Sequence, residues 1–283
     1  MLRIAIQKSG RLSDGSLSLL KGCGLKFNGG KSQLMTPALN FPAQVLFLRD
    51  DDIPQYVEDG VADIGIIGEN ALLESESNVE IVRRLGFSRC RVSLAVPKSV
   101  EYDGLSYFSG KQIATSYSNI LKNFLNKNRI DAEIHTISGS VEIAPSIGLA
   151  DGIMDIVSTG STLLSNGLKE VEVVFKSEAV LIKGPDLSED NQGNLKSLDF
   201  RIASVLAARD FKYILLNAPN DKVDHIVDIL PGMKSPTVLP LAEQGWSSIH
   251  SVVNERMFWD VIDQLKDLGA QGILVVPIEK MIL

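Results

Sequence analysis

The sequence predicts an α/β protein built from two similar lobes and a separate C-terminal module. Strand-like apolar runs alternate with helical stretches in the first part of the chain, and one segment of the first half resembles a segment of the second. Residues 210–283 follow a different order of elements. With 283 residues the chain suits two or three domains, since domains usually contain about 100 to 200 residues.

The first lobe begins with a strand over Leu2 to Ile6, in which apolar residues alternate, followed by a loop and a helix capped by Ser13 or Asp14. Further strands are predicted at 45–48, 63–67, 91–96, 112–115, 155–157 and 171–175. Helical stretches separate most of these strands. This alternation favours a largely parallel arrangement.

An internal similarity supports two lobes. Asp59 to Gly68 aligns without gaps on Asp151 to Gly160, and each copy suggests a helix that ends at a glycine, a buried strand and a glycine-containing loop. Coincidence between two ordinary α/β units is the alternative. We expect Arg91 to Pro97 to lead into the second lobe and Val171 to Ile182 to lead back, which leaves a hinged cleft between the lobes.

The C-terminal part predicts an exposed loop over 186–193, a helix over 195–209 and then a separate module. Its elements are a strand, a helix, two strands, a helix and a strand, at 212–216, 221–230, 237–241, 248–253, 255–268 and 272–277. This βαββαβ order is ferredoxin-like. Modules of this kind more often regulate or oligomerise an enzyme than catalyse.

Composition excludes several classes of protein. The formal charge of −7 argues against a nucleic-acid partner. No apolar run reaches the roughly 18 residues that span a bilayer, and the N-terminus lacks the apolar stretch of a secretory signal, so we expect a cytoplasmic protein without membrane contact. Two cysteines and three distant histidines suggest neither a disulfide framework nor a zinc site.

The clearest phosphate-binding candidate is the segment from Asp155 to Thr162. It follows a buried strand, where backbone N–H groups can turn toward an anion, and it combines a glycine with several hydroxyl side chains. A common Ser/Thr-rich turn is the alternative. The candidate ligands here are Asp155, Ser158, Thr159, Gly160, Ser161 and Thr162.

Basic residues of the first lobe form the second candidate. Lys8, Gly10 and Arg11 follow the first strand and precede a helix, which suits a phosphate or polyphosphate, although a solvated basic turn is equally possible. Arg49 ends another strand, whereas the aspartates after it resemble a helix start. Arg83 and Arg84 are further basic groups that could hold a small anion.

Three candidates could contact a sugar or base. Glu69 and Asn70 could hydrogen-bond a base or ribose, or cap a helix. Glu142 could hold ribose hydroxyls or stabilise positive charge at a sugar carbon, or be an ordinary first-turn glutamate. Tyr117 could stack on a base, although tyrosine is more often partly buried core.

Taken together, these segments resemble the long form of the ATP phosphoribosyltransferase family nearly end to end. The matching segments are 7–13, 49–54, 63–70, 113–117, 139–142, 155–160, 239–242 and 273–281. Ser118 stands where the family usually has proline, which weakens the match around Tyr117 only. The main alternative is a two-lobed small-molecule-binding or sensor protein without catalysis.

The resemblance implies a periplasmic-binding-protein-like catalytic core and a ferredoxin-like, ACT-like regulatory domain. The expected boundaries are 1–92 with 180–209 for lobe one, 93–179 for lobe two and 210–283 for the regulatory domain. It also implies that adenine N1 of ATP attacks C1 of phosphoribosyl pyrophosphate and displaces pyrophosphate, with Mg²⁺ bound by ligands that the sequence does not identify.

By position, the resemblance places the ribose 5-phosphate on Ser158 to Thr162, with Glu142 and Asp155 near the ribose hydroxyls. Glu142 and Arg49 are the expected catalytic residues. Nucleotide or pyrophosphate is expected near Lys8, Gly10, Arg11 and Arg49. Base or ribose is expected near Glu69, Asn70 and Tyr117.

The C-terminal module resembles the domain through which histidine inhibits long-form members. The resemblance suggests walls for this inhibitor site at Ala218, Leu239, Ile273 and Leu274, and it implies a homo-oligomer, a dimer or hexamer. A catalytic but unregulated chain, whose last module serves only assembly, is the remaining alternative.

Overall fold

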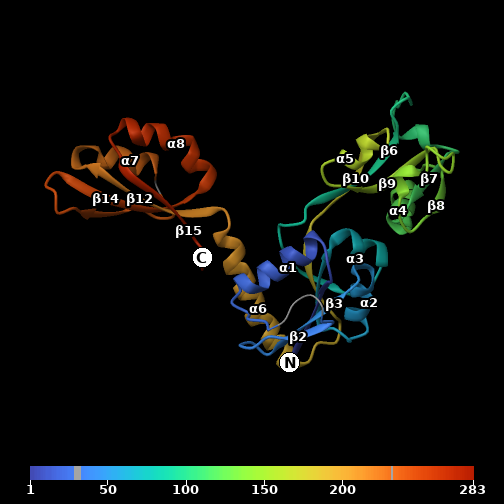
Figure 1. Cartoon of the computed structure of the whole chain (residues 1–283), viewed down its shortest axis with the longest axis horizontal. Helices are drawn as coiled ribbons and strands as arrows, with labels where there is room; N and C mark the ends of the chain where they lie inside the picture. The colour runs from blue at the N-terminus through green and yellow to red at the C-terminus, as the bar shows by residue number, and fades with distance from the viewer. Residues whose placement is uncertain (29–32, 231) are drawn as a thin grey trace. The chain divides into compact units, whose positions relative to one another are not determined.

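The computed structural model describes residues 1–28, 33–230 and 232–283 (Figure 1). These residues form two compact units, Met1–Ser197 and Leu198–Leu283. The division falls inside helix α6 (Glu189–Ala208): the second unit begins at Leu198, 12 residues before residue 210, where the regulatory domain was expected to start. Because α6 begins at Glu189, the exposed loop expected over 186–193 is only partly a loop, and the prediction of that loop was wrong at its C-terminal end.

Lobe one is a six-stranded sheet of order β2-β3-β1-β4-β11-β5. Its strands are β1 (Leu2–Gln7), β2 (Met35–Pro37), β3 (Ala43–Leu48), β4 (Ile64–Gly68), β5 (Glu80–Arg84) and β11 (Ala179–Lys183). β1 pairs in parallel with β3 and β4, whereas β11 is antiparallel to β4 and β5. Helices α1 (Arg11–Gly22), α2 (Ile53–Glu58) and α3 (Glu69–Ser75) belong to this lobe.

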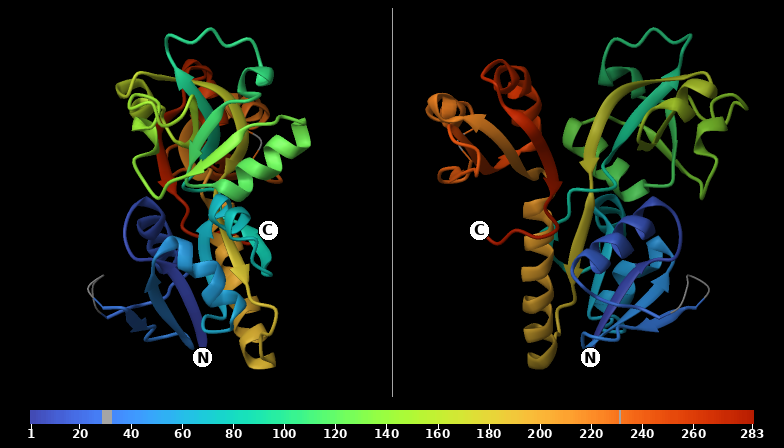
Figure 2. Two further views of the ribbon diagram at one scale, coloured as in Figure 1. Left: turned by 90° about the vertical axis from the view of Figure 1, so that its right-hand side faces the viewer. Right: turned by 60° about the vertical axis from the view of Figure 1, so that its left-hand side comes forward.

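Lobe two is a five-stranded sheet of order β10-β6-β9-β7-β8. Its strands are β6 (Cys90–Pro97), β7 (Gln112–Thr115), β8 (Glu133–Thr136), β9 (Gly152–Val157) and β10 (Leu168–Ser177). Its α-helices are α4 (Ser118–Asn128) and α5 (Ser161–Ser165). Figure 2 shows the long antiparallel strands β6 and β10 side by side, close to the points where the chain enters and leaves this lobe.

The predicted pair of similar lobes is confirmed. β4 and β9 occupy equivalent places in their sheets. β4 lies between the parallel strand β1 and the antiparallel strand β11, and β9 lies between the parallel strand β7 and the antiparallel strand β6. The gapless alignment nevertheless does not superpose the two strands. It pairs Asp63 with Asp155, but Asp63 precedes β4, whereas Asp155 lies inside β9. Asp63 binds the backbone and side chain of Arg3, so it has a structural role that Asp155 does not share.

Several local predictions of helices and strands were wrong. Helix α1 begins at Arg11, because Gly10 serves as its N-cap in place of Ser13 or Asp14. Before the second of the two similar segments, Asp151 to Gly160, the chain forms a short 3₁₀ turn, Val141–Ile143, instead of the expected helix. Strands β2, β5 and β8 were not predicted, since they are short and rich in polar or exposed residues. Strand β11 was not predicted either: it is buried and apolar, but its residues were assigned to the segment that leads back from lobe two.

Apolar side chains of the central strands form the cores of both lobes. Ile4 and Ile6 in lobe one, and Leu94 and Ile153 in lobe two, are fully buried. Strands that are covered on both faces are nearly continuous in apolar residues, which explains why their positions could be predicted. Their carboxyl ends leave polar loops at one edge of each sheet, where ligands of open α/β sheets bind.

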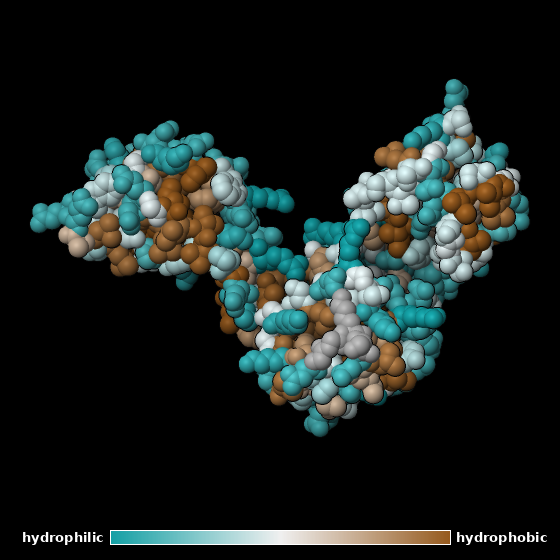
Figure 3. Space-filling view, viewed as in Figure 1, coloured by the Kyte–Doolittle hydropathy of each residue, from teal (hydrophilic) through white to brown (hydrophobic). Residues whose placement is uncertain are grey.

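The C-terminal unit has the predicted βαββαβ order. Its elements are β12 (Phe211–Pro219), α7 (Val223–Ile229), β13 (Thr237–Pro240), β14 (Trp246–Asn254), α8 (Glu255–Asp267) and β15 (Gln271–Pro277). The sheet order is β13-β14-β12-β15, and every neighbouring pair is antiparallel. The helices pack on one face of the sheet, whereas Leu239 and Leu274 on its strands are exposed. Figure 3 shows apolar surface, coloured brown, on this unit.

Candidate functional site

Two loops of the same design face the region between the lobes. Each follows the carboxyl end of a strand, β1 or β9, continues for two residues, and then reaches a glycine that is the N-cap of a helix. Gly10 has φ 93° and Gly160 has φ 83°, a left-handed region in which other residues are strained. Neither N-cap glycine has a side chain that could cap its helix, and among the described residues Thr159 Oγ1 accepts only the Ser161 backbone N–H, at 3.4 Å, so both loops leave further backbone N–H groups for an anion.

The loop of lobe one, Lys8–Arg11, is basic and exposed. Arg11 Nη1 donates a hydrogen bond of 3.3 Å to Ser158 Oγ, so this side chain reaches from one loop to the other. Arg49 follows β3 on extended backbone. Within the described residues, neither Lys8 nor Arg49 has an ion-pair partner, which leaves both cations available to an anionic ligand.

The loop of lobe two, Ser158–Thr162, offers hydroxyl groups. Thr159 Oγ1 and Ser161 Oγ lie 3.0 Å apart, whereas the Thr162 hydroxyl makes no hydrogen bond in the described part of the chain. Helix α5 has only five residues, so its dipole is small and the hydroxyl and N–H groups must bind any phosphate.

An arginine supports this hydroxyl loop from the crossing strands. Arg91 Nη1 donates to the carbonyl oxygen of Ser158 at 3.1 Å. Its other nitrogens bind both carboxylate oxygens of Glu170 at 2.5 Å, and this pairing raises the pKa of Arg91 and lowers that of Glu170. The bidentate pair fixes the guanidinium beneath the loop.

Tyr117 lies among acidic residues of both lobes. Burial, followed by the charges of Asp155, Asp50 and Asp51, raises the pKa of its hydroxyl, and the nearby side chain of Asn70 opposes this rise. Burial and the neighbouring Asp51 raise the pKa of Asp50 to about 6. The buried Oδ1 of Asp50 has no hydrogen-bond partner among the described residues, so it could accept a hydrogen bond from a ligand.

Glu142 and Asp155 are close enough to influence each other. Burial is the main cause that raises the pKa of Asp155, the backbone N–H of Ile156 opposes it, and the charge of Glu142 adds to it. The structure therefore brings Glu142, an expected catalytic residue, near Asp155, which lies just before the hydroxyl loop. It places Arg49, the other expected catalytic residue, on lobe one.

Glu69 and Asn70 are buried, at 7% and 5% exposure. Glu69 forms an ion pair with Arg84, and burial raises its pKa despite that pair. Asn70 Oδ1 accepts a hydrogen bond of 2.8 Å from Ser177 Oγ. Both side chains thus have structural partners, and Glu69 also lines a cavity beside the crossing strands.

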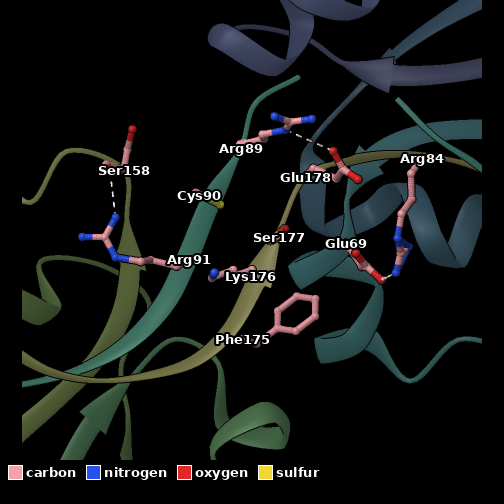
Figure 4. Close-up of a pocket in the computed structure, with 10 residues that line it drawn as sticks. All are labelled: Glu69, Arg84, Arg89, Cys90, Arg91, Ser158, Phe175, Lys176, Ser177 and Glu178. Carbon is pink, nitrogen blue, oxygen red and sulfur yellow. Dashed lines mark hydrogen bonds and ion pairs between the residues drawn. The ribbon is translucent and has the colours of Figure 1, made fainter. Parts of the chain in front are cut away.

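A cavity of about 530 Å³ lies beside the crossing strands (Figure 4). Arg84, Arg89, Arg91 and Lys176 line it, together with Ser158 of the hydroxyl loop. Figure 4 shows Arg91 turned toward Ser158 and Arg89 toward Glu178. Arg84 was predicted as a basic group that could hold an anion. The other three were not predicted, because their segments indicate only connecting strands and give no sign that these side chains line a cavity.

A second cavity, of about 510 Å³, lies between the lobes, where Asp51 and Glu74 face Ser116, Tyr117 and Thr136. Pockets that bind small molecules usually have volumes of about 300 to 1,000 Å³. Both cavities therefore have room for part of a nucleotide.

The described residues contain no group of three side chains that could hold a metal ion by themselves. Magnesium commonly binds one or two protein carboxylates together with substrate phosphates. Asp155 and Glu142, near the hydroxyl loop, fit that second kind of site.

The four expected inhibitor-site residues share one sheet but not one cluster. Ala218 is buried in the core beneath the helices, and Ile273 packs against that core. Leu239 and Leu274 are exposed. Leu239 pairs with Ser248, which is opposite Asn217, so Leu239 lies on the face away from Ala218.

Among the described residues, every helix is too short or too polar to cross a membrane.

Comparison with known proteins matches nearly the whole chain. The family described as "HisG: ATP phosphoribosyltransferase" matches residues 49–204, and "HisG, C-terminal domain" matches residues 208–280. The ATP phosphoribosyltransferase of Bacteroides thetaiotaomicron is 58% identical over 282 residues, with 100% of both chains covered. That of Cytophaga hutchinsonii is also 58% identical, over 100% of this chain and 99% of its own.

A solved structure agrees with these matches. The ATP phosphoribosyl transferase (HisG:HisZ) complex from Thermotoga maritima contains a chain that is 30% identical and has a TM-score of 0.61. The alignment covers 72% of this chain and 99% of that one.

Proposed function

Because this chain belongs to the ATP phosphoribosyltransferase family, we propose that its cleft joins N1 of the ATP adenine to C1 of the ribose of phosphoribosyl pyrophosphate, with release of pyrophosphate. The family membership makes the chain a pentosyltransferase of the first step of histidine biosynthesis. The details of the reaction and the place of each substrate are our proposal.

The pair of glycine loops supports the proposal most directly. Two loops with free N–H groups, on opposite lobes and bridged by Arg11 and Ser158, suit a substrate with phosphates at both ends. Pyrophosphate carries the greater charge and calls for cations, so we assign it to Lys8, Arg11 and Arg49. The single 5-phosphate then belongs to the hydroxyl loop, Ser158–Thr162.

In the reaction, the lone pair of adenine N1 forms a bond to C1 as the bond from C1 to the pyrophosphate oxygen breaks. The electrons of that bond leave with pyrophosphate, and the sugar carbon inverts. Attack through a free lone pair requires no general base, so catalysis depends on positioning and electrostatics. The carboxylates of Glu142 and Asp155 would hold ribose hydroxyls and stabilise positive charge that develops on the sugar.

The base and its ribose fit the interlobe region around Tyr117. The tyrosine ring offers a flat surface, and the unpartnered oxygen of Asp50 offers an acceptor to an exocyclic amine. Glu69 and Asn70 would form the boundary of this region. ATP phosphates would lie toward the basic residues of the neighbouring cavity.

Magnesium fits this site as a partner of the substrate. Asp155 and Glu142 would hold it together with phosphoribosyl pyrophosphate. When bound, Mg²⁺ neutralises charge on the leaving pyrophosphate.

We further propose that histidine inhibits the enzyme through the C-terminal unit, and that the chain forms homo-oligomers, dimers or hexamers. The unit has the architecture of a regulatory module, and apolar side chains on its strands are exposed. A cytoplasmic location stays a prediction from the sequence.

The direct test is to mix the protein with ATP, Mg²⁺ and phosphoribosyl pyrophosphate and to follow the absorbance of the N1-substituted adenine. We expect turnover that requires all three; no product would contradict the proposal and would favour a sensor. Millimolar histidine should reduce the rate. A rate indifferent to histidine would contradict feedback inhibition while leaving the transferase reaction intact.

A further inference from the structure

Helix α4 of lobe two begins at the cleft and takes its N-terminal cap from lobe one. Its own N-cap residue, Tyr117, makes no capping hydrogen bond through its side chain. Instead, the carboxylate of Glu74 on α3 accepts hydrogen bonds from the backbone N–H of Asn119 at 3.0 Å and of Ile120 at 3.0 Å. Its Oε1 also accepts a bond of 3.2 Å from the Ser118 hydroxyl.

The backbone of Glu74 takes part as well. Asn119 Nδ2 donates a hydrogen bond of 2.8 Å to the carbonyl oxygen of Glu74. The first N–H groups of a helix have no partner within it, and a negative charge at this end is favourable. One residue of lobe one therefore satisfies the N-terminus of an 11-residue helix of lobe two, through charged hydrogen bonds that are stronger than neutral ones.

Helix α3 makes a second contact on the same face. Asn70 precedes Glu74 by four residues, so the two side chains lie one turn apart. The Asn70 side chain lies near enough to the Tyr117 hydroxyl to lower the pKa of that hydroxyl, and Ser177 Oγ donates a hydrogen bond of 2.8 Å to Asn70 Oδ1. Tyr117 is thus held at its backbone by the helix that Glu74 caps, and the Asn70 side chain lies near its hydroxyl.

This arrangement also affects where phosphate can bind. A free helix N-terminus at the carboxyl end of β7 would attract a phosphate. Here the Glu74 carboxylate already occupies the N–H groups of α4, so phosphates are left to the two glycine loops and to the basic cavity. The negative charge of Glu74 further disfavours a phosphate at this end of the cleft.

We propose that Glu74 is a positioning residue, which holds the two lobes in the arrangement that places Tyr117 against the substrates of the proposed transferase reaction. Glu74 acts through α4 and Tyr117 and does not itself contact the reacting atoms. Without it, the lobes separate more often and the binding-competent fraction of the enzyme falls. The apparent dissociation constant rises as that fraction falls, equally for every ligand that needs the closed form.

The experiment uses the full-length protein with Glu74→Ala and Glu74→Gln, and Glu76→Gln as the control. Glu76 is exposed at the end of the same helix and makes no hydrogen bond or ion pair among the described residues. Glu74→Gln keeps the size of the side chain and provides a folded variant should the alanine change impair folding. Hydrogen exchange of the peptide that contains Asn119 and Ile120 reports on the cap without any need for turnover.

We expect exchange of this peptide to be about ten-fold faster in Glu74→Ala, which corresponds to loss of a cap contribution of about 1.4 kcal/mol. KM for ATP and for phosphoribosyl pyrophosphate should rise together, by roughly three- to ten-fold, with kcat nearly unchanged. For Glu74→Gln, both the exchange rate and the two KM values should lie between those of Glu74→Ala and the wild type.

Unchanged exchange would overturn the proposal. A lower kcat at constant KM would do so too, because a merely structural residue reduces the amount of folded enzyme without changing the affinity of the rest. If the wild-type protein makes no product, the proposed reaction fails, and hydrogen exchange still decides whether Glu74 holds the lobes.

Discussion

The two glycine loops share one backbone design and differ in their side chains. Lys8–Arg11 and Ser158–Thr162 both follow a strand, place a left-handed glycine at an N-cap and leave N–H groups free. The first adds cations, whereas the second adds hydroxyl groups. Backbone geometry thus suits each loop to an anion, as we propose, and the side chains determine how much negative charge it suits.

The difference has a consequence for the proposed reaction. Cations beside the leaving pyrophosphate stabilise charge that grows in the transition state, so they should contribute mainly to kcat. Hydroxyl groups on the 5-phosphate contact a part of the substrate that does not react. These contacts should contribute mainly to the binding of phosphoribosyl pyrophosphate.

The largest expected effect is that of Arg49→Ala. Loss of this cation should lower kcat by about 10²- to 10³-fold, as removal of other transition-state charge partners does. Steady-state kinetics with both substrates measures the effect. Lys122→Ala, an exposed change on α4, is the control and should alter kcat less than two-fold. A purely KM effect for Arg49→Ala would place Arg49 away from the leaving group.

The next effect concerns Asp50, the neighbour of Arg49. Its pKa is raised from 3.8 to about 6, because burial disfavours the charged form. Ionisation of Asp50 therefore lowers the free energy of unfolding. This loss is absent below pH 3.8, grows between pH 3.8 and about pH 6, and is complete above about pH 6. Asp50→Asn cannot ionise, so it should be more stable than wild type at pH 7.5, by about 1–3 kcal/mol.

Thermal unfolding measured from pH 4 to 8 checks this expectation, with the exposed Asp52→Asn as control. The gain from Asp50→Asn should shrink as pH falls through 6 toward 4. A gain that does not depend on pH would show that burial of the charge is not its cause.

Ser177→Ala should have a smaller effect, and on stability rather than on binding. It removes the hydroxyl that accepts from the Asn70 backbone at 3.1 Å and donates to its side chain at 2.8 Å. Buried groups without partners cost about 1–3 kcal/mol each, so we expect a loss of about 2 kcal/mol in denaturant unfolding. KM for phosphoribosyl pyrophosphate should stay within two-fold; a ten-fold rise would assign Asn70 to the phosphate site.

Thr162→Val should give the smallest change in free energy and the most specific one. We expect KM for phosphoribosyl pyrophosphate to rise about ten-fold, about 1.4 kcal/mol, with KM for ATP within two-fold. Stability should be nearly unchanged because the Thr162 side chain is exposed. Thr237→Val, an exposed change in the C-terminal unit, is the control. Equal effects on both substrates would contradict the assignment of the loop to the 5-phosphate.

The fold could be predicted largely because buried strands have continuous apolar sequences. The runs at 2–6, 112–115 and 212–216 became strands, and the βαββαβ order of the last module was confirmed. Gly10 was not expected as an N-cap, because Ser13 and Asp14 are residue types that cap helices more often. The hydroxyl and basic loops stood out because both follow predicted strands.

Contacts between distant segments could not be predicted from local patterns. Nothing near Tyr117 indicates that its helix is capped by Glu74, since the two are joined only when the lobes meet. The partnership of Arg91 with Glu170 likewise depends on the antiparallel pairing of β6 with β10. The sequence indicated strands there, and the side chains that line the cavity were missed.

A crystal structure of the enzyme with phosphoribosyl pyrophosphate and Mg²⁺ tests most directly which of the two loops binds the 5-phosphate and which binds pyrophosphate. We predict that the 5-phosphate accepts hydrogen bonds from Ser158–Thr162, while pyrophosphate contacts Lys8, Arg11 and Arg49. A 5-phosphate bound at Lys8–Arg11, with no ligand atom on the hydroxyl loop, would contradict this account.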